Sequence, residues 1–200
     1  MKSIAIRPLD TRMALPKSYQ TSAKRQLRGG MPLTLQGSPG RTKATGHGVA
    51  FLASTALDQL GGPANGGSAI AEGFGNVGSH AAHTLDTYGM SIRGVSDVHG
   101  AICNDTKIHL AKLRKHLAKH GTVAGFAEAE AIDPQEMLEQ KCDILAPCAM
   151  ERAILKDNAA KLRCKVLAEG AKRDRALDEL TTSDRWKNDW HVEAPLWSKT

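Results

Sequence analysis

Three glycines and one aspartate form the pattern in this chain that is best suited to chemistry. The stretch Gly73-Phe74-Gly75-Asn76-Val77-Gly78 has the spacing G-x-G-x-x-G, and Asp97 stands 19 residues after its last glycine. In such a pattern the first glycine makes a tight turn, the second lets a pyrophosphate approach the backbone, and the third lets a helix pack closely on a strand. A carboxylate at the end of the following strand can accept both hydroxyls of an adenosine ribose. The pattern therefore predicts a dinucleotide site.

The elements around the glycines have to position such a site. A short apolar strand over residues 68–72 leads into the motif, a helix begins near Asn76, and a strand over residues 91–96 ends at Asp97. Free N–H groups and the dipole at a helix N-terminus favour a phosphate there. A G-x-G-x-x-G hexapeptide is weak evidence by itself, and a glycine-rich turn with a surface aspartate is the alternative. The strand before it and the helix after it favour the dinucleotide.

Short apolar strands alternate with helical segments along the middle of the chain. Periodic apolar positions predict helices at residues 49–60, 76–88, 106–120, 134–138 and 151–162, and strands at 68–72, 91–96, 143–146 and 165–169. This alternation predicts an α/β fold with one doubly wound, mostly parallel Rossmann-type sheet, in a single domain with irregular tails.

The charge of the chain is concentrated at its beginning. Residues 1–28 hold seven Lys and Arg side chains against one acid, which equals the whole net charge of +6, and the other residues hold 20 basic and 20 acidic side chains. A neutral body argues against a nucleic-acid-binding face. We expect residues 1–28 to be a disordered basic lead-in, residues 29–171 a dinucleotide-binding domain, and residues 172–200 a divergent tail that holds all three tryptophans. An organelle transit peptide is the alternative for the lead-in.

Hydropathy and cysteine spacing bound the class of protein. No apolar run approaches the roughly 18 residues that a membrane span needs. The four cysteines, Cys103, Cys142, Cys148 and Cys164, form no C-x-x-C pair, which favours reduced thiols over a disulfide framework or a zinc site. We therefore expect a cytoplasmic protein without a metal, or a mitochondrial one if residues 1–28 are a transit peptide.

Several blocks of sequence, taken together, resemble one enzyme family. They are G-R-T-K-A-T-G-H-G from Gly40, A-E-G-F-G-N-V-G-S-H-A-A, V-S-D-V-H-G-A-I-C-N, D-I-L-A-P-C-A and K-V-L-A-E-G-A. In this order they are similar to the coenzyme-binding part of glutamate dehydrogenases, within the glutamate, leucine, phenylalanine and valine dehydrogenase family. The first block favours the glutamate branch.

The resemblance implies roles for the matching positions. It implies that Arg41 and Thr45 lie near the nicotinamide, although Thr45 also suits a helix N-cap. It places Phe74, Asn76 and Val77 at the pyrophosphate turn and Asp97 at the adenosine ribose. Cys148 and Ala149, after Pro147, would meet the adenosine, with Cys148 as a small apolar filler rather than a nucleophile.

Two positions depart from the family pattern. Lys172 replaces the usual Asn after E-G-A, near the nicotinamide ribose. His99 stands where members that prefer NAD often have an acid, and an imidazole there lowers the repulsion toward a 2′-phosphate. The expected cofactor is therefore NAD, with NADP possible.

The family also implies chemistry that this sequence does not carry. It oxidatively deaminates L-glutamate to 2-oxoglutarate and ammonia, with a lysine and an aspartate on a separate substrate domain. No G-G-x-K-G-type segment is present here. We therefore expect no catalytic residues in this chain and no activity from it alone. A separate substrate-domain chain or a homo-oligomer would be its partner; a catalytically silent dinucleotide-binding module and a truncated gene product are the alternatives.

Overall fold

One sheet of eight strands organises the molecule, in the order β5-β4-β3-β2-β6-β7-β1-β8. The computed structural model describes residues 4–6, 40–149, 153–170 and 191–192. The strands are β1 (Ile4–Ile6), β2 (Ser68–Glu72), β3 (Ser91–Asp97), β4 (Gly100–Cys103), β5 (Glu130–Ile132), β6 (Ile144–Pro147), β7 (Val166–Ala168) and β8 (His191–Val192). The helices are α1 (Arg41–Gln59), α2 (Asn76–Thr87), α3 (Leu110–His120), α4 (Pro134–Leu138) and α5 (Lys156–Ala159).

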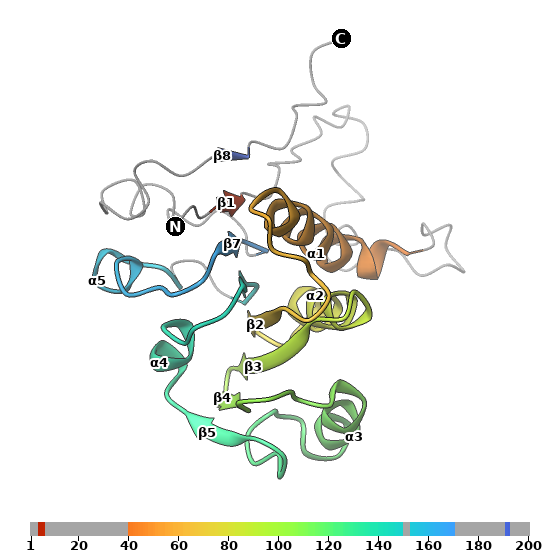
Figure 1. Ribbon diagram of the computed structural model, residues 1–200. Coiled ribbons are helices and arrows are strands. Elements are labelled where there is room, and N and C mark those ends of the chain that lie inside the picture. Colours follow the sequence, from red (N-terminus) through yellow and green to blue (C-terminus); the bar gives the residue numbers. More distant parts are fainter. Residues whose placement is uncertain (1–3, 7–39, 150–152, 171–190, 193–200) are drawn as a thin grey trace, which may run out of the picture.

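The sheet is mostly parallel, and helices cover both of its faces. The central strand β2 pairs in parallel with β3 on one side and β6 on the other, and β6 pairs in parallel with β7. Helices α1, α2 and α3 lie on one face, and α4 and α5 on the opposite face (Figure 1). The predicted doubly wound α/β fold is confirmed.

The chain order reverses beside β2. After β5, at one edge, the chain returns across the sheet to form β6 next to β2. The carboxyl ends of β2 and β6 therefore diverge into connections that run to opposite sides. In open α/β sheets, ligands bind in the crevice outside such a switch point. The G-x-G-x-x-G turn follows directly after β2 and so lies at this edge.

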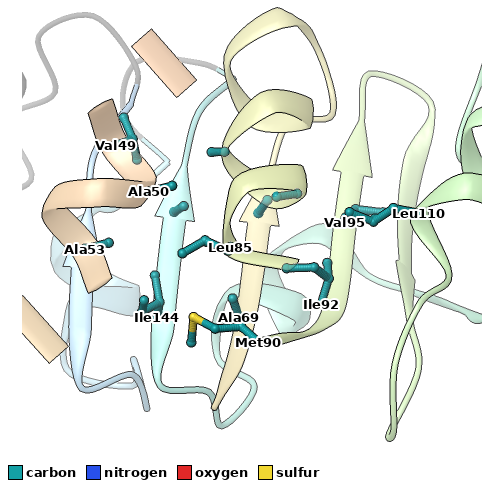
Figure 2. Close-up of a cluster of buried hydrophobic side chains, with 14 of the residues drawn as sticks. Val49, Ala50, Ala53, Ala69, Leu85, Met90, Ile92, Val95, Leu110 and Ile144 are labelled. Carbon is teal, nitrogen blue, oxygen red and sulfur yellow. The ribbon is translucent and has the colours of Figure 1, made fainter. Parts of the chain in front are cut away.

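Alternating side chains of each central strand build a core on both faces. Ala69 and Ala71 of β2 join the cluster under α1, α2 and α3, whereas Ile70 joins the cluster under α4 and α5. Figure 2 shows the first cluster, in which Leu85 of α2 and Met90 lie over the sheet. Because both faces are covered, β2, β6 and β7 are short continuous apolar runs rather than alternating ones.

Two strands were missed in the sequence. β4 pairs antiparallel with β3, and β5 pairs antiparallel with β4. The turn between β3 and β4 has only two residues, Val98 and His99, so the motif's aspartate sits at a hairpin rather than before a helix. The two strands have four and three residues, too short to show a period.

Three predicted helix limits were wrong. α1 begins at Arg41, so Thr45 lies inside the helix and is not its N-cap. α3 begins at Leu110 rather than at residue 106, because the Asn104 side chain accepts hydrogen bonds from the N–H groups of Thr106 and Lys107 and holds a turn there. Within the predicted 151–162 helix, the described part is helical only over Lys156–Ala159.

The short strands β1 and β8 were also not expected. Where the sequence predicts a disordered lead-in and a divergent tail, β1 pairs in parallel with β7, and β8 with β1. The other residues of 1–28 and 172–200, including all three tryptophans, lie outside the described residues. Within the described ranges, none of the helices combines the length and the apolar character needed to cross a lipid bilayer.

Candidate functional site

The turn after β2 is held in place by β3. Gly73 has a φ of 86°, which glycine adopts without strain. Its N–H donates to Ser96 Oγ at 3.0 Å, and the N–H of Phe74 donates to the Ser96 carbonyl oxygen at 2.6 Å. Ser96 is buried and immediately precedes Asp97. One residue therefore fixes both the glycine turn and the start of the predicted ribose site.

The three glycines of the motif have different surroundings. A Cβ on Gly73 would collide with Ala149, and a Cβ on Gly78 would collide with the Gly73 carbonyl oxygen. Nothing lies within 4 Å of the Cβ position of Gly75, which is exposed. The first and third glycines thus serve packing within the protein, while the second leaves space outside it.

The beginning of α2 faces this space with uncapped backbone. Gly75 is the N-cap residue of α2 and makes no side-chain capping hydrogen bond. The first N–H groups of a helix have no partner within the helix and favour an anion. Asn76 is exposed and Val77 is half-buried. The Phe74 side chain is buried in the core and its N–H already donates to Ser96, so neither is available to a ligand. This arrangement fits a pyrophosphate.

The ends of β2 and β6 are tied together. The N–H of Cys148 donates to the Glu72 carbonyl oxygen at 2.7 Å, and Glu72 Oε2 accepts from the N–H groups of Cys148 and Ala149 at 3.2 and 3.1 Å. Ala149 also touches the Cβ position of Gly73. Cys148 and Ala149 are thereby placed beside the glycine turn; that they meet the adenosine stays a prediction.

The Cys148 thiol is closely packed. Its Sγ lies 2.7 Å from the position that a Cβ on Gly170 would take. Burial and the neighbouring Glu72 charge raise the pKa of Cys148 to about 12, against a smaller opposite effect of a hydrogen bond with the Gly170 backbone. A thiol with such a pKa supplies almost no thiolate at neutral pH, so this environment suits a filler and not a nucleophile.

Asp97 is held by two backbone N–H groups. Its Oδ1 accepts from His99 at 2.8 Å and its Oδ2 accepts from Val123 at 2.7 Å. Partial burial raises the pKa of Asp97, but these two hydrogen bonds, the Thr122 hydroxyl and the nearby His99 ring outweigh that effect, so the pKa lies below its ordinary value. An ionised carboxylate has about four acceptor positions, and with three of them taken one remains for a ribose hydroxyl.

The first turns of α1 approach α2 through a glycine. A Cβ on Gly46 would lie 2.5 Å from the Val77 carbonyl oxygen and 2.6 Å from the Cβ of His80. Thr45, the residue before it, is exposed. Arg41 is the first residue of the same helix. Both predicted nicotinamide residues therefore lie at the end of α1 that carries Gly46 and its contact with Val77 of α2.

Sequence reasoning missed four residues that build this site. Glu72 links two strand ends, Ser96 holds the turn, and Thr122 and Val123 hold Asp97. Glu72 and Ser96 each directly precede a predicted site residue at the end of a strand, which is a usable signal. Thr122 and Val123 come from a distant loop, and no local pattern points to them.

The sheet order, the switch point and the glycine turn define a Rossmann-type α/β domain. Residues 37–173 match the family model described as Glutamate/Leucine/Phenylalanine/Valine dehydrogenase. The chain therefore belongs to the glutamate, leucine, phenylalanine and valine dehydrogenase family, and it carries the NAD(P)-binding domain of that family.

Individual relatives agree with this membership. The chain is 39% identical to the NADP-specific glutamate dehydrogenase of Saccharolobus shibatae over 142 residues, and 39% identical to the glutamate dehydrogenase of Thermotoga maritima over 143 residues. Each match covers 71% of this chain and 34% of the relative, so the chain spans about a third of the length of these relatives. A hetero-hexameric glutamate dehydrogenase of Thermus thermophilus, in its leucine-bound form, shares the fold with a TM-score of 0.66 at 23% identity, over 81% of this chain and 38% of that one.

Proposed function

We propose that this chain binds NAD at the carboxyl ends of β2 and β6, as the cofactor-binding part of a glutamate dehydrogenase-like oxidoreductase. The pyrophosphate would lie against the backbone of residues 73–78, the adenosine ribose against Asp97, and the adenosine against Cys148 and Ala149. Arg41 and Thr45 would lie toward the nicotinamide. When bound, NAD supplies the hydride acceptor for oxidation of an amino acid.

The observation that carries the proposal is the contrast among the three glycines. Protein atoms already occupy the space beside Gly73 and Gly78, but the space beside Gly75 is open and lies at the uncapped start of α2. A turn that served packing alone would have no reason to keep the middle position free of a side chain. A diphosphate that needs main-chain N–H groups gives such a reason.

The charge at Asp97 favours NAD over NADP. Its lowered pKa keeps the carboxylate ionised at neutral pH, where it accepts a ribose hydroxyl and repels a 2′-phosphate. The exposed imidazole of His99, two residues further along the chain, weakens that repulsion. The Saccharolobus shibatae relative is NADP-specific, so the preference has to be measured in this chain.

The binding test is a fluorescence titration of the purified chain with NADH and with NADPH. We expect saturable binding of both, with the lower Kd for NADH. Equal or tighter binding of NADPH would contradict the assignment of Asp97, and no binding of either would contradict the proposed function.

A second assay addresses turnover. We expect that the 200-residue chain by itself, given L-glutamate and NAD, produces no NADH, because the family's lysine and aspartate belong to a substrate-binding region that we do not find in its sequence. Activity that arises only when a separate substrate-domain chain is added would support a role as one half of an enzyme. Binding without turnover under every such condition would favour a silent dinucleotide-binding module.

A further inference from the structure

The loop between α3 and β5 forms a second wall beside Asp97. Within it, the Val123 N–H donates to Asp97 Oδ2 at 2.7 Å, and the Ala124 N–H donates to Thr122 Oγ1 at 3.1 Å. The side chains of Val123 and Phe126 are buried in the core under α3. The Val123 N–H can therefore reach Asp97 only while this loop, residues 121–126, stays packed against the core.

The His116 side chain of α3 also holds this loop. His116 Nε2 lies 3.0 Å from the Ala124 carbonyl oxygen. Because a carbonyl oxygen only accepts, Nε2 carries the proton and donates. The same ring packs edge-on against Phe126, with 5.6 Å between the ring centroids, and stacks on His120, with 4.5 Å between the ring centroids. A short series of contacts thus runs from His116 through Ala124 and Val123 to Asp97.

We propose that His116 is a positioning residue for Asp97, and that it thereby sets how strongly the site prefers a dinucleotide without a 2′-phosphate over one with it. This inference rests on the proposed function, because it assumes that Asp97 faces the adenosine ribose. His116 lies on α3, touches no part of the proposed ligand site directly, and would act on it through Asp97.

Charge repulsion distinguishes NADPH from NADH only when the Asp97 carboxylate cannot move. With one oxygen held by Val123 and the other by His99, the Asp97 carboxylate cannot turn away from an incoming phosphate. Loss of the His116 hydrogen bond loosens the backbone at Ala124, next to Val123, and so weakens one of these two anchors. The carboxylate then rotates away from a 2′-phosphate and also holds the ribose hydroxyl less firmly.

The test compares the ratio of the NADPH and NADH dissociation constants in four full-length proteins: wild type, His116→Ala, His116→Gln and His120→Ala. We expect His116→Ala to lower the ratio about fivefold to tenfold, which is the size of effect that one hydrogen bond produces. His116→Gln keeps an N–H donor and should restore most of the ratio. His120→Ala removes only the ring stack and should leave the ratio unchanged.

Two results would overturn the inference while leaving NAD binding intact. One is an unchanged ratio in His116→Ala, including the case where both constants rise equally, as a purely structural role would produce. The other is a decrease of the NADPH to NADH ratio in His120→Ala that is as large as the decrease in His116→Ala.

A measurement without ligand separates this inference from the proposed function. If wild type binds neither dinucleotide, the proposed function fails, but hydrogen exchange of the Val123 amide still reports the positioning. We expect that amide to exchange at least about tenfold faster in His116→Ala and at the wild-type rate in His120→Ala. Equal rates in wild type and His116→Ala would refute the role of His116.

Discussion

The carbonyl oxygen of Gly73 occupies the place that a side chain on Gly78 would need. A Cβ on Gly78 would also lie 3.2 Å from the Cβ of Cys148. The first turn of α2 can therefore rest on the end of β2 only because residue 78 has no side chain. This contact fixes the start of the helix relative to the turn, and with it the position of the N–H groups that would face a phosphate.

The substitution Gly78→Ala is expected to destabilise the protein strongly. Overpacking costs about 1–3 kcal/mol, and here the obstacle is backbone, which cannot move aside as a side chain would. Urea denaturation measures the change. Gly75→Ser is the matched control, because its Cβ meets nothing and a serine N-cap can accept from the helix N–H groups. Equal stability of Gly78→Ala and wild type would show that the turn is not packed as described.

Two glycines in α1 provide a second matched pair. Gly46→Ala pushes against the Val77 carbonyl oxygen at 2.5 Å and the backbone nitrogen of Ala81 at 2.8 Å, so we expect a loss of about 1–3 kcal/mol in the free energy of unfolding. In the same helix, the Cβ of Gly48→Ala meets no atom within 4 Å. We expect this substitution to raise the free energy of unfolding by about 0.5–1 kcal/mol. Thermal unfolding of both variants checks this, and a loss in Gly48→Ala as large as in Gly46→Ala would contradict the close approach of α1 and α2.

Asp143 should make stability depend on pH in the acid range. Its Oδ2 accepts from the Ser68 N–H and hydroxyl, and its Oδ1 pairs with Lys165 at 2.7 Å. Partial burial raises the pKa of Asp143, but these partners outweigh it and lower the pKa below its ordinary value. A lowered folded-state pKa gives stability that is present at neutral pH and is lost as the pH falls below about 4.

We therefore expect Asp143→Asn to cost about 1.5–3 kcal/mol near pH 7 and less as the pH falls toward about 3. Denaturation curves across this range measure the difference from wild type. The exposed pair Arg93–Asp105 supplies the control, because Asp105→Asn should change stability by less than about 1 kcal/mol. A cost of Asp143→Asn that does not shrink in acid would argue against the charged network.

The cysteines should react slowly in the folded protein. Burial raises the pKa of Cys148 to about 12 and that of Cys103 to about 11, and it raises the pKa of Cys142 well above its ordinary value; Cys164 is buried as well. We expect slow modification of all four by a disulfide reagent at neutral pH and rapid modification in urea. A single fast thiol that disappears in Cys148→Ala would instead identify Cys148 as reactive.

Much of the central architecture could be predicted from the sequence. Ser68–Glu72, Asn76–Thr87 and Ser91–Asp97 are the strand, helix and strand that the periodicity and glycine punctuation indicated. Their patterns are strong because nearly every apolar position in them is buried, on one face of the sheet or the other. β4 and β5 escaped because strands of four and three residues have no measurable period.

The contacts that complete the site depend on residues far apart in the chain. The pairing of Asp97 with Val123 joins positions 26 residues apart, and that of Glu72 with Ala149 joins positions 77 apart. Nothing in the local sequence near Val123 marks it as a partner, because a backbone N–H carries no signature in its side chain. Such partners become visible only once the sheet brings the loops together.

The most direct measurement is a titration of NADH against wild type and Gly75→Leu. Apart from its own chain neighbours, no protein atom lies within 4 Å of the Gly75 Cβ position, so a side chain can begin there without a clash and occupy the space proposed for the pyrophosphate. We expect Gly75→Leu to remain folded, as judged by its urea denaturation, and to bind NADH at least about a hundredfold more weakly, which corresponds to about 2.7 kcal/mol. If the folded variant binds NADH as tightly as wild type, the pyrophosphate does not lie against this turn and the account is wrong.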